Sequence, residues 1–336
     1  MLNKKYFFPK SMVIMAMLSA VIMACGGNKT SATANGEQPL AGPDFNADSA
    51  WAFCLRQCQF GPRVMNSAAH DSCAQWIVSR FQQYGMTVSQ QHATLKGYDG
   101  TSLNATNIIA SFKPKAANRI LICAHYDCRP WADNDADSAN WQKPVMGAND
   151  GASGVAVMIE LARLLSLNDS LDRGVDFVCF DAEDWGVPQW SDHQGDGSDT
   201  WALGAQHWAL KAKESGYKAD YGILLDMVGG QGATFYREGY SQTYAPAIVE
   251  KVWQSAHVLG YGSLSPFADG SMITDDHVPV NTIAGIPTID IVPYYPDCPQ
   301  SSFGPRWHTI ADTMDGIDAN TLKAVGQTII QVLYSE

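Results

Sequence analysis

The sequence predicts a three-layer α/β sandwich with a central, twisted, mixed but largely parallel sheet. Apolar strand-like runs alternate with helical patterns from about residue 105 to the C-terminus, and such alternation builds βαβ units around a parallel sheet. The runs at 119–127 and 175–180 are apolar nearly throughout rather than at every second position. This pattern indicates strands that are buried on both faces.

The elements can be assigned in chain order. Helical periodicity covers 46–60 and 67–84, and strand-like runs follow at 87–94 and 106–112. The alternating region then gives strand 119–127, helix 151–167, strand 175–180, helix 203–215, strand 221–229, helix 244–259, strand 288–294 and helix 318–334, for which Asp318 is the expected N-cap.

The N-terminal residues predict export. Cations in "MLNKKYFFPK" precede the apolar stretch "SMVIMAMLSAVIMA", which is too short for a comfortable membrane span. The following "VIMAC" resembles the lipobox of bacterial lipoproteins, whose cysteine, here Cys25, becomes the lipidated first residue. A plain signal peptide with cleavage nearby is the alternative. We therefore expect a signal peptide at 1–24, a lipidated cysteine and flexible tether at 25–45, and one catalytic domain at 46–336. The protein would lie in the bacterial cell envelope as a periplasm-facing lipoprotein. It would touch the membrane only through its lipid anchor.

The charge balance argues against nucleic acid as a partner. The chain has 22 Lys and Arg against 34 Asp and Glu, with no basic cluster beyond the extreme N-terminus. Seven cysteines remain after Cys25, an odd number, so they cannot all pair with one another. No CxxC pair occurs, which argues against a cysteine-based zinc site.

Polar residues collect where the predicted strands end. "FDAEDWG" (180–186) places three carboxylates at the end of an apolar run, and other strand-end loops carry further His, Asp and Glu. In open α/β sheets ligands bind outside the carboxyl ends of the strands. Histidine and carboxylate without cysteine are the ligand set of a catalytic zinc with an open position. A divalent ion would also compensate carboxylates that could not otherwise stay ionised close together.

Six motifs in order carry a resemblance to a known family: "HYD", "GANDGASG", "FDAED", "LLDMVG", "DDHVP" and "WHT". The set resembles the zinc exopeptidase clan of aminopeptidases, and within it most closely the animal-type glutaminyl cyclases, including bacterial forms. The resemblance runs from about residue 105 to 334. It implies a zinc aminopeptidase-like fold, one zinc per chain, and conversion of the N-terminal glutamine of peptides or proteins to pyroglutamate with release of ammonia.

The resemblance also implies roles for individual residues. Asp150, Asp184 and His308 would hold the zinc, and Glu183 would carry the proton. Asp184 stands where the animal enzymes have Glu, so its reach to the metal is shorter. Asp226 and Asp275 would be further catalytic carboxylates. Trp190 and Trp307 would line the substrate pocket. The supporting residues would be Asp290, His125 and Asp181. Asp290 replaces a histidine of the animal enzymes.

Several residues have simpler interpretations. Asp150 could cap the helix at 151–167, and His277 is expected to be structural and oriented by Asp276. Trp185 and Trp201 are expected to pack rather than line the pocket. The loop 131–142 has a D-x-D-x-D rhythm but lacks the glycine and distal glutamate of a calcium loop, so we expect it to be solvated. The histidines that match no motif, to which we assign no role, are His70, His92, His193, His207 and His257.

Two other functions remain open. A two-zinc aminopeptidase of the same fold would use Glu183 to activate a water, and its five metal ligands would be His125, Asp150, Asp184, Asp226 and His308. "DDHVP", Trp190 and the Trp before the His in "RWHT" fit cyclases better. A non-catalytic zinc-binding lipoprotein is the third possibility, and the intact Glu183 argues against it.

Overall fold

The structure is a computed structural model that describes residues 41–194 and 197–335. The expected signal peptide, Cys25 and most of the expected tether lie outside the described residues. Residues 41–45, assigned to the tether above, are instead packed against the last helix, α8 (Ala319–Tyr334). Phe45 is 1% exposed, and its backbone N–H donates to Gln327 Oε1 at 2.8 Å. The folded chain therefore extends further toward the N-terminus than residue 46, because Phe45 has an apolar surface to cover.

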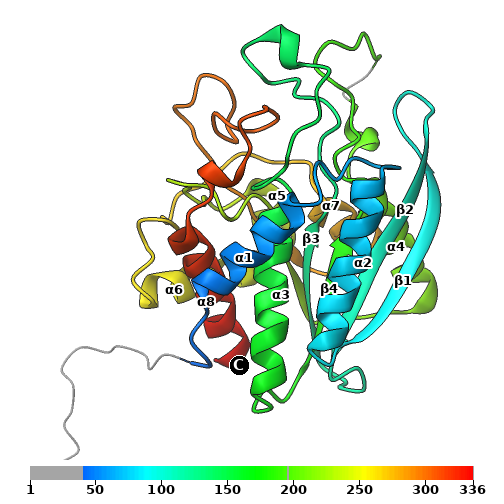
Figure 1. The fold of residues 1–336 in the computed structure, drawn as a ribbon. Helices are drawn as coiled ribbons and strands as arrows, with labels where there is room; N and C mark the ends of the chain where they lie inside the picture. The colour runs from blue at the N-terminus through cyan, green and yellow to red at the C-terminus, as the bar shows by residue number, and fades with distance from the viewer. Residues whose placement is uncertain (1–40, 195–196, 336) are drawn as a thin grey trace, which may run out of the picture. The chain divides into compact units, whose positions relative to one another are not determined.

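A six-stranded sheet forms the centre of the fold (Figure 1). Its strands are β1 (Thr87–Lys96), β2 (Ser102–Phe112), β3 (Arg119–His125), β4 (Gly174–Phe180), β5 (Tyr221–Leu225) and β6 (Thr288–Ile291). In space their order is β1-β2-β4-β3-β5-β6. The four strands β4, β3, β5 and β6 are parallel to one another, whereas the pairs β1–β2 and β2–β4 at one edge are antiparallel. The predicted mixed, largely parallel sheet is confirmed.

Helices cover both faces of this sheet. One face packs against α1 (Ala47–Cys58), α2 (Ala68–Gln83), α3 (Ala152–Leu167), α6 (Pro246–Val258) and α8. The other face packs against α4 (Leu203–Ser215) and the short turns α7 (His277–Pro279) and η3 (Val280–Ala284), while α5 (Gly239–Tyr244) precedes α6. The remaining short helical turns are η1 (Ser138–Asn140), η2 (Ser198–Thr200) and η4 (Met314–Gly316).

The alternation of side chains along β3 explains the continuous apolar runs. Ile120 and Ile122 belong to the core beneath α3, and Leu121 and Cys123 belong to the core beneath α4. All residues of β3, β4, β5 and β6 are buried. Because both faces are covered, no polar position is needed within these strands.

Boundaries differ from the predictions in a few places. The strands predicted at 119–127 and 221–229 end earlier, at His125 and Leu225, because the chain turns there into site loops. The helix predicted at 244–259 is two helices that meet at Ala245, before Pro246. Asp318 caps α8 as expected, accepting a hydrogen bond from the Asn320 N–H. All cysteines in the described residues are free, and Cys123, Cys128 and Cys179 are buried.

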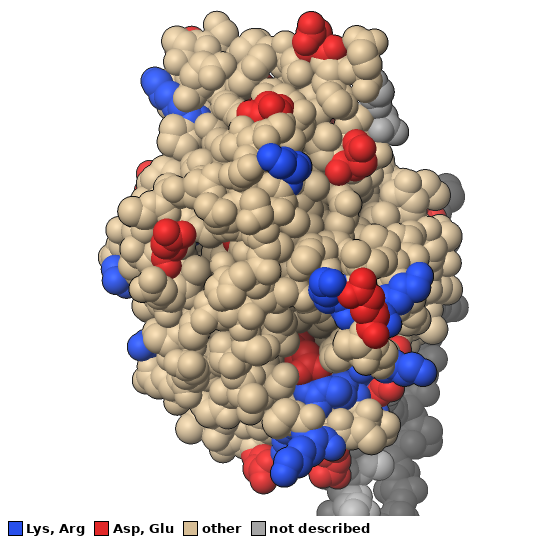
Figure 2. Space-filling model, turned by 90° about the vertical axis from the view of Figure 1, so that its right-hand side faces the viewer, with Lys and Arg blue, Asp and Glu red and all other residues tan. Residues whose placement is uncertain are grey.

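The charged side chains on one face of the molecule are of mixed sign. On the face shown in Figure 2, the described Lys and Arg side chains lie among Asp and Glu and form no continuous basic patch. Within the described ranges, every helix is too short or too polar to cross a bilayer.

Candidate metal centre

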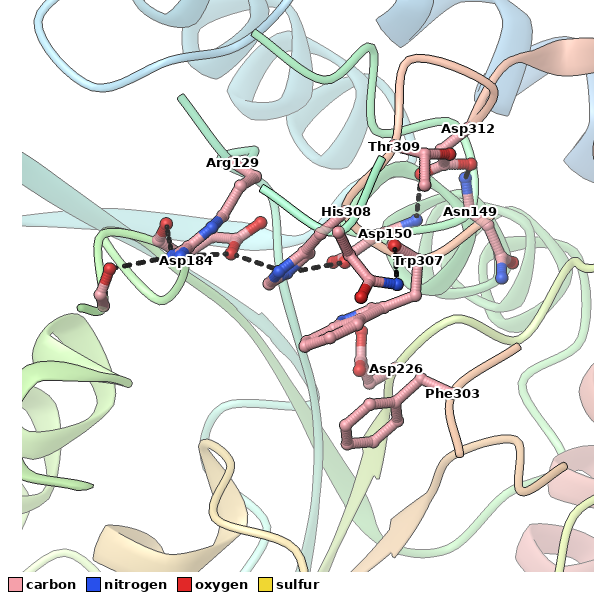
Figure 3. A network of polar contacts seen from close by, with 12 residues as sticks. Arg129, Asn149, Asp150, Asp184, Asp226, Phe303, Trp307, His308, Thr309 and Asp312 are labelled. Atoms are coloured by element: carbon pink, nitrogen blue, oxygen red, sulfur yellow. Dashed lines mark hydrogen bonds and ion pairs between the residues drawn. The ribbon is translucent and has the colours of Figure 1, made fainter. Parts of the chain in front are cut away.

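The parallel strands bring three predicted ligands together at their carboxyl ends. Asp150 precedes α3, Asp184 follows β4, and His308 lies in the long loop between β6 and α8. One oxygen from each carboxylate and one imidazole nitrogen lie within 4.8 Å of one another. His308 Nε2 is 3.2 Å from Asp184 Oδ1 and 3.6 Å from Asp150 Oδ2. Figure 3 shows the imidazole between the two carboxylates.

Asp150 is free to bind a ligand because it does not cap α3. The N-cap is Gly151, at φ 88°, and no side chain caps this helix. A Cβ at position 151 would lie 2.6 Å from the carbonyl oxygen of Asp127 and 3.0 Å from the ring of His125. The loop is anchored from the other side, since Asp312 accepts the N–H groups of Asn149 and Asp150 at 2.9 and 3.1 Å. The capping interpretation of Asp150 is therefore wrong.

A strained turn carries Glu183 and Asp184. Ala182, between them and β4, has φ 52°, which is uncommon for a residue other than glycine. The N–H groups of Glu183 and Asp184 both donate to the carboxylate of Asp127, at 3.2 and 3.1 Å. Adjacent acidic residues can thus take different positions in the site.

Asp181 holds this turn from behind, as its predicted supporting role requires. It accepts hydrogen bonds from the Tyr126 hydroxyl at 2.8 Å and from the N–H groups of Thr106 and Ala182 at 2.6 and 2.9 Å. Its Oδ1 also lies 2.8 Å from His70 Nε2. Burial lowers the pKa of His70, but the charge and hydrogen bond of Asp181 outweigh burial and raise it to about 9. His70, which matches no motif, is thus the counter-charge of Asp181.

Arg129 and Asp133 hold the metal ligands from outside. Asp133 Oδ1 lies 3.5 Å from His308 Nδ1, and Arg129 forms two hydrogen bonds with the Asp133 carboxylate, at 3.0 and 2.7 Å. Arg129 also donates to the backbone carbonyl oxygens of Asp184 and Gly186 (Figure 3). Asp133 is 2% exposed, so the interpretation of 131–142 as a solvated loop fails at this residue.

The residues present fit a metal ion. Both carboxylate oxygens of Asp184 are buried and have no hydrogen-bond donor among the described residues. Unpaired buried carboxylates are costly, and a divalent cation satisfies them together with Asp150. The Asp133 carboxylate beside His308 Nδ1 leaves Nε2 as the ligand atom, which is the usual arrangement behind a metal-bound histidine. The donor set, two carboxylates and one imidazole, suits zinc with an open position.

A second group of possible ligands shares Asp150 with the first. His125 Nε2 lies 3.0 Å from Asp150 Oδ1 and 3.2 Å from Asp226 Oδ1. The ligand atoms of these three residues also lie within 4.8 Å of one another. All five residues of the two-metal alternative are therefore assembled, and the geometry alone fits one metal or two.

A cavity of about 440 Å³ opens beside the metal group and contains the predicted catalytic carboxylates. Glu183, Asp226 and Asp275 line it, and Trp307 and Phe303 form part of its wall with ring centroids 4.9 Å apart. Burial and the neighbouring Asp184 and Asp275 raise the pKa of Glu183 well above its ordinary value, against the opposing effect of His125. Burial and Asp275 likewise raise the pKa of Asp226 to about 7.

The structure exchanges the roles expected for two tryptophans. Trp190 stacks on Trp141 with ring centroids 5.9 Å apart and meets Trp131 edge-on, and it is not among the residues that line the cavity. Trp201, expected to pack, lines the cavity and stacks on His308. Both lie in the loop between β4 and α4, whose irregular course gives no periodic signal.

Asp290 and His277 lie behind the cavity. Asp290, one of the three predicted supporting residues, is fully buried on β6. His277 is fully buried, in agreement with the structural role predicted for it. The residue that orients it is Glu238 rather than Asp276, because His277 Nε2 lies 3.1 Å from Glu238 Oε2. Glu238 belongs to none of the motifs considered above and is 39 residues from His277 in the chain, so the motifs could not indicate it.

The sequence profile of peptidase family M28 matches residues 107–333. Among solved structures, a glutaminyl cyclase from Bacteroides thetaiotaomicron, bound to N-acetylhistamine, is 48% identical with a TM-score of 0.84, covering 88% of this chain and 99% of that one. A Zn-dependent exopeptidase from Parabacteroides distasonis is 46% identical with a TM-score of 0.85, covering 88% and 100%. The similarity thus includes both candidate activities.

Curated relatives give the same two activities. An aminopeptidase from Bacillus subtilis is 29% identical over 270 residues, which is 77% of this chain and 50% of the relative. A glutaminyl-peptide cyclotransferase from Boiga irregularis is 26% identical over 263 residues, which is 69% of this chain and 65% of the relative. The chain therefore spans half to just under two thirds of these relatives.

Proposed function

The chain belongs to peptidase family M28, and within this family we propose that it is a zinc-dependent glutaminyl cyclase. Its substrates would be peptides or proteins with an N-terminal glutamine, and its products pyroglutamyl peptide and ammonia. One observation carries the proposal: Glu183, Asp226 and Asp275 converge in an aromatic-walled cavity of about 440 Å³ beside Asp150 and His308. The 48% identity with a bacterial glutaminyl cyclase over nearly its whole length supports it.

The reaction joins the α-amine nitrogen to the γ-carbonyl carbon of the same glutamine and breaks the bond from that carbon to the amide nitrogen. A zinc ion held by Asp150, Asp184 and His308 supplies Lewis-acid polarisation of the γ-carbonyl. Glu183 accepts one proton from the attacking amine and delivers it to the leaving amide nitrogen, which departs as ammonia. Glu183 therefore ends the cycle in its starting state.

The other cavity residues position the substrate. Asp226 and Asp275 accept hydrogen bonds from the α-amine and hold it toward the γ-carbonyl. Trp307 and Trp201 contact the aliphatic part of the glutamine side chain and exclude water, and hydrolysis of the amide is thereby disfavoured.

The substitution Glu183→Gln tests the proton-transfer role. We expect kcat for a glutaminyl peptide to fall by about 100-fold or more, with an unchanged zinc content. The measurement is ammonia release together with mass spectrometry of the peptide, which should lose 17 Da. An unimpaired Glu183→Gln variant would contradict the role, and release of free amino acid without cyclised peptide from the wild-type protein would overturn the cyclase.

A two-zinc aminopeptidase is the second candidate, and the shared ligand Asp150 favours it. His125, Asp150 and Asp226 form a second group of ligand distance beside the first. Metal analysis of the purified protein separates the candidates, because we expect about one zinc per chain for the cyclase and two for the peptidase. An aminoacyl p-nitroanilide should be cleaved only by the peptidase.

We further propose that the protein is an exported lipoprotein anchored through Cys25. The cationic start, the short apolar stretch and "VIMAC" support this location. Metabolic labelling with a fatty acid should mark the wild-type protein and leave the Cys25→Ala variant unlabelled. Labelling of both proteins would contradict lipidation at Cys25.

A further inference from the structure

Two acidic residues and one histidine with unsatisfied atoms are enclosed behind the wall of the cavity, next to Asp275, which lines it. Asp276 and Asp290 are fully buried, and none of their carboxylate oxygens has a hydrogen-bond donor among the described residues. His277 is fully buried too, and its Nδ1 has no partner at hydrogen-bond distance. One oxygen of Asp275, one of Asp290 and a ring nitrogen of His277 lie within 4.8 Å of one another.

The other nitrogen of His277 is fixed by Glu238. His277 Nε2 lies 3.1 Å from Glu238 Oε2, and a carboxylate held by donors can only accept, so Nε2 must carry the proton. His277 Nδ1 then faces Asp290 Oδ2 at 3.8 Å. Burial raises the pKa of Glu238, but His277 and the backbone donors outweigh burial and lower it to about 2.

Glu238 also organises the segment that carries Asp275. Its Oε1 accepts the N–H of Ile273 at 2.9 Å, two residues before Asp275. Its Oε2 accepts both the N–H and the hydroxyl of Ser241, whose hydroxyl oxygen in turn accepts the N–H of Asp290. The Glu238 carboxylate thus links the start of α5, the segment 271–275 in the cavity wall, and β6.

We propose that Glu238 and His277 are positioning residues for the substrate-binding carboxylate Asp275, a role that rests on the proposed cyclase function. Glu238 fixes the ring of His277, whose Nδ1 faces Asp290 Oδ2 at 3.8 Å, beyond hydrogen-bond distance. Burial and the neighbouring Asp275 raise the pKa of Asp290 well above its ordinary value, so Asp290 is the member of the pair that holds a proton. Asp290 therefore adds no second full negative charge beside Asp275. Asp275 is left as the carboxylate that binds the α-amine of the substrate.

Burial raises the pKa of Asp275 above its ordinary value, and His277 is the largest of the influences that limit this rise. His125 acts in the same direction from β3. The titratable groups that face the cluster from the neighbouring elements are Glu238, Asp290, Asp276, Asp226, Glu183, Asp127, His125 and Cys123.

The substitution His277→Gln separates charge from shape. Glutamine Nε2 can still donate to Glu238, so the wall segment keeps its anchor, but Nδ1 is lost. The effect of His277 on Asp275 is then lost, and the pKa of Asp275 should rise further. We expect the acidic limb of the kcat/KM profile for a glutaminyl peptide to move up by about 1 pH unit, with KM raised most at low pH and with unchanged zinc content.

His257→Gln is the matched control, because His257 Nε2 also makes a single hydrogen bond, to the Ser265 carbonyl at 2.9 Å, on the exposed side of α6. Its pH profile should equal that of the wild type. A wild-type profile in His277→Gln would overturn the proposal. Loss of a metal ion from that variant would also overturn it, because the cluster would then hold a cation rather than a proton.

Nitrogen NMR of histidine-labelled protein tests the same point without relying on activity. The His277 signals are assigned by their absence in His277→Gln. We expect Nε2 to carry the proton that it donates to Glu238, and an unprotonated Nε2 would overturn the proposal whatever reaction the enzyme performs. If this result holds but no cyclised peptide forms in the wild type, the proposed function fails and the proton arrangement stands.

Discussion

At the scale of single residues, the metal group depends on side chains that never contact the metal. His308 and Asp184 are each held by the Arg129–Asp133 pair, the first through its ring nitrogen and the second through its backbone. The carboxylate behind a ligating histidine fixes the ring and strengthens its binding. Asp133 is therefore expected to contribute directly to metal affinity.

The substitution Asp133→Asn should lower zinc affinity by about 10- to 100-fold. The measurement is competition with a chelator of known affinity. Asp135→Asn is the matched control in the same loop, because Asp135 accepts hydrogen bonds from Asp137, Asn140 and Ile310 and does not contact His308. Equal affinities of the two variants would contradict the role of Asp133.

His70 gives a prediction for stability against pH. Its pKa is raised to about 9 in the folded protein, against about 6.5 when unfolded. Because folding raises this pKa, protonated His70 stabilises the folded state fully below pH 6.5. This contribution, on the order of 3 kcal/mol, is lost as the pH rises through 9. Denaturant unfolding of the wild type and of His70→Gln between pH 6 and 9.5 should therefore show a stability difference that shrinks with increasing pH. A difference that is constant or grows would contradict the pairing with Asp181.

At the scale of elements, the N-terminus of α3 must approach β3 closely. Gly151 combines a left-handed φ of 88° with backbone and ring atoms at 2.6 and 3.0 Å from the position of a Cβ. Gly216, the C-cap of α4, has a similar φ of 71° but nothing within 4 Å. Substitution of the two glycines by alanine therefore separates the free-energy cost of the left-handed backbone from the cost of a steric clash with neighbouring atoms.

Gly216→Ala should cost about 1 kcal/mol of unfolding free energy. Gly151→Ala should cost roughly 3 kcal/mol or more and should also weaken zinc binding, because His125 and Asp127 must move. Chemical denaturation and metal analysis measure the two effects. Similar losses in both variants would show that the contact around Gly151 is not constraining.

At the scale of the whole molecule, the fold collects buried carboxylates at one edge of the sheet, and the metal should contribute to its stability. Removing zinc leaves Asp150 and Asp184 close together without compensation, so a chelator should lower Tm. At free zinc a thousandfold above Kd, the stabilisation is about 4 kcal/mol. Calorimetry with and without chelator checks this, and Asp184→Asn should respond much less. An unchanged Tm in the wild type would contradict a metal at this site.

Much of this arrangement follows from sequence pattern. Apolar alternation predicted the order of strands and helices, and the strand-end rule brought Asp150, Asp184 and His308 to one edge. The pattern could not predict which loop side chains meet. Trp201 rather than Trp190 lines the cavity, and Glu238 rather than Asp276 orients His277, because these contacts join irregular segments far apart in the chain. Asp133 was misassigned for the same reason, since it contacts His308 in a loop far along the chain.

The packing of residues 41–45 on α8 sets the point at which the described chain leaves the domain. The Ala41 N–H donates to Gln331 near the C-terminal end of α8, whereas the Asp318 N–H at the other end donates to the carbonyl oxygen of Gly229, close to the cavity residue Met227. Sixteen helical residues separate the two ends, a length of about 24 Å, and Figure 1 shows the C-terminus at the end of the domain away from the site loops. A bead or surface joined to the N-terminal side of the domain would thus attach away from the cavity, and the attachment point would not block the entry of the protruding ends of large proteins.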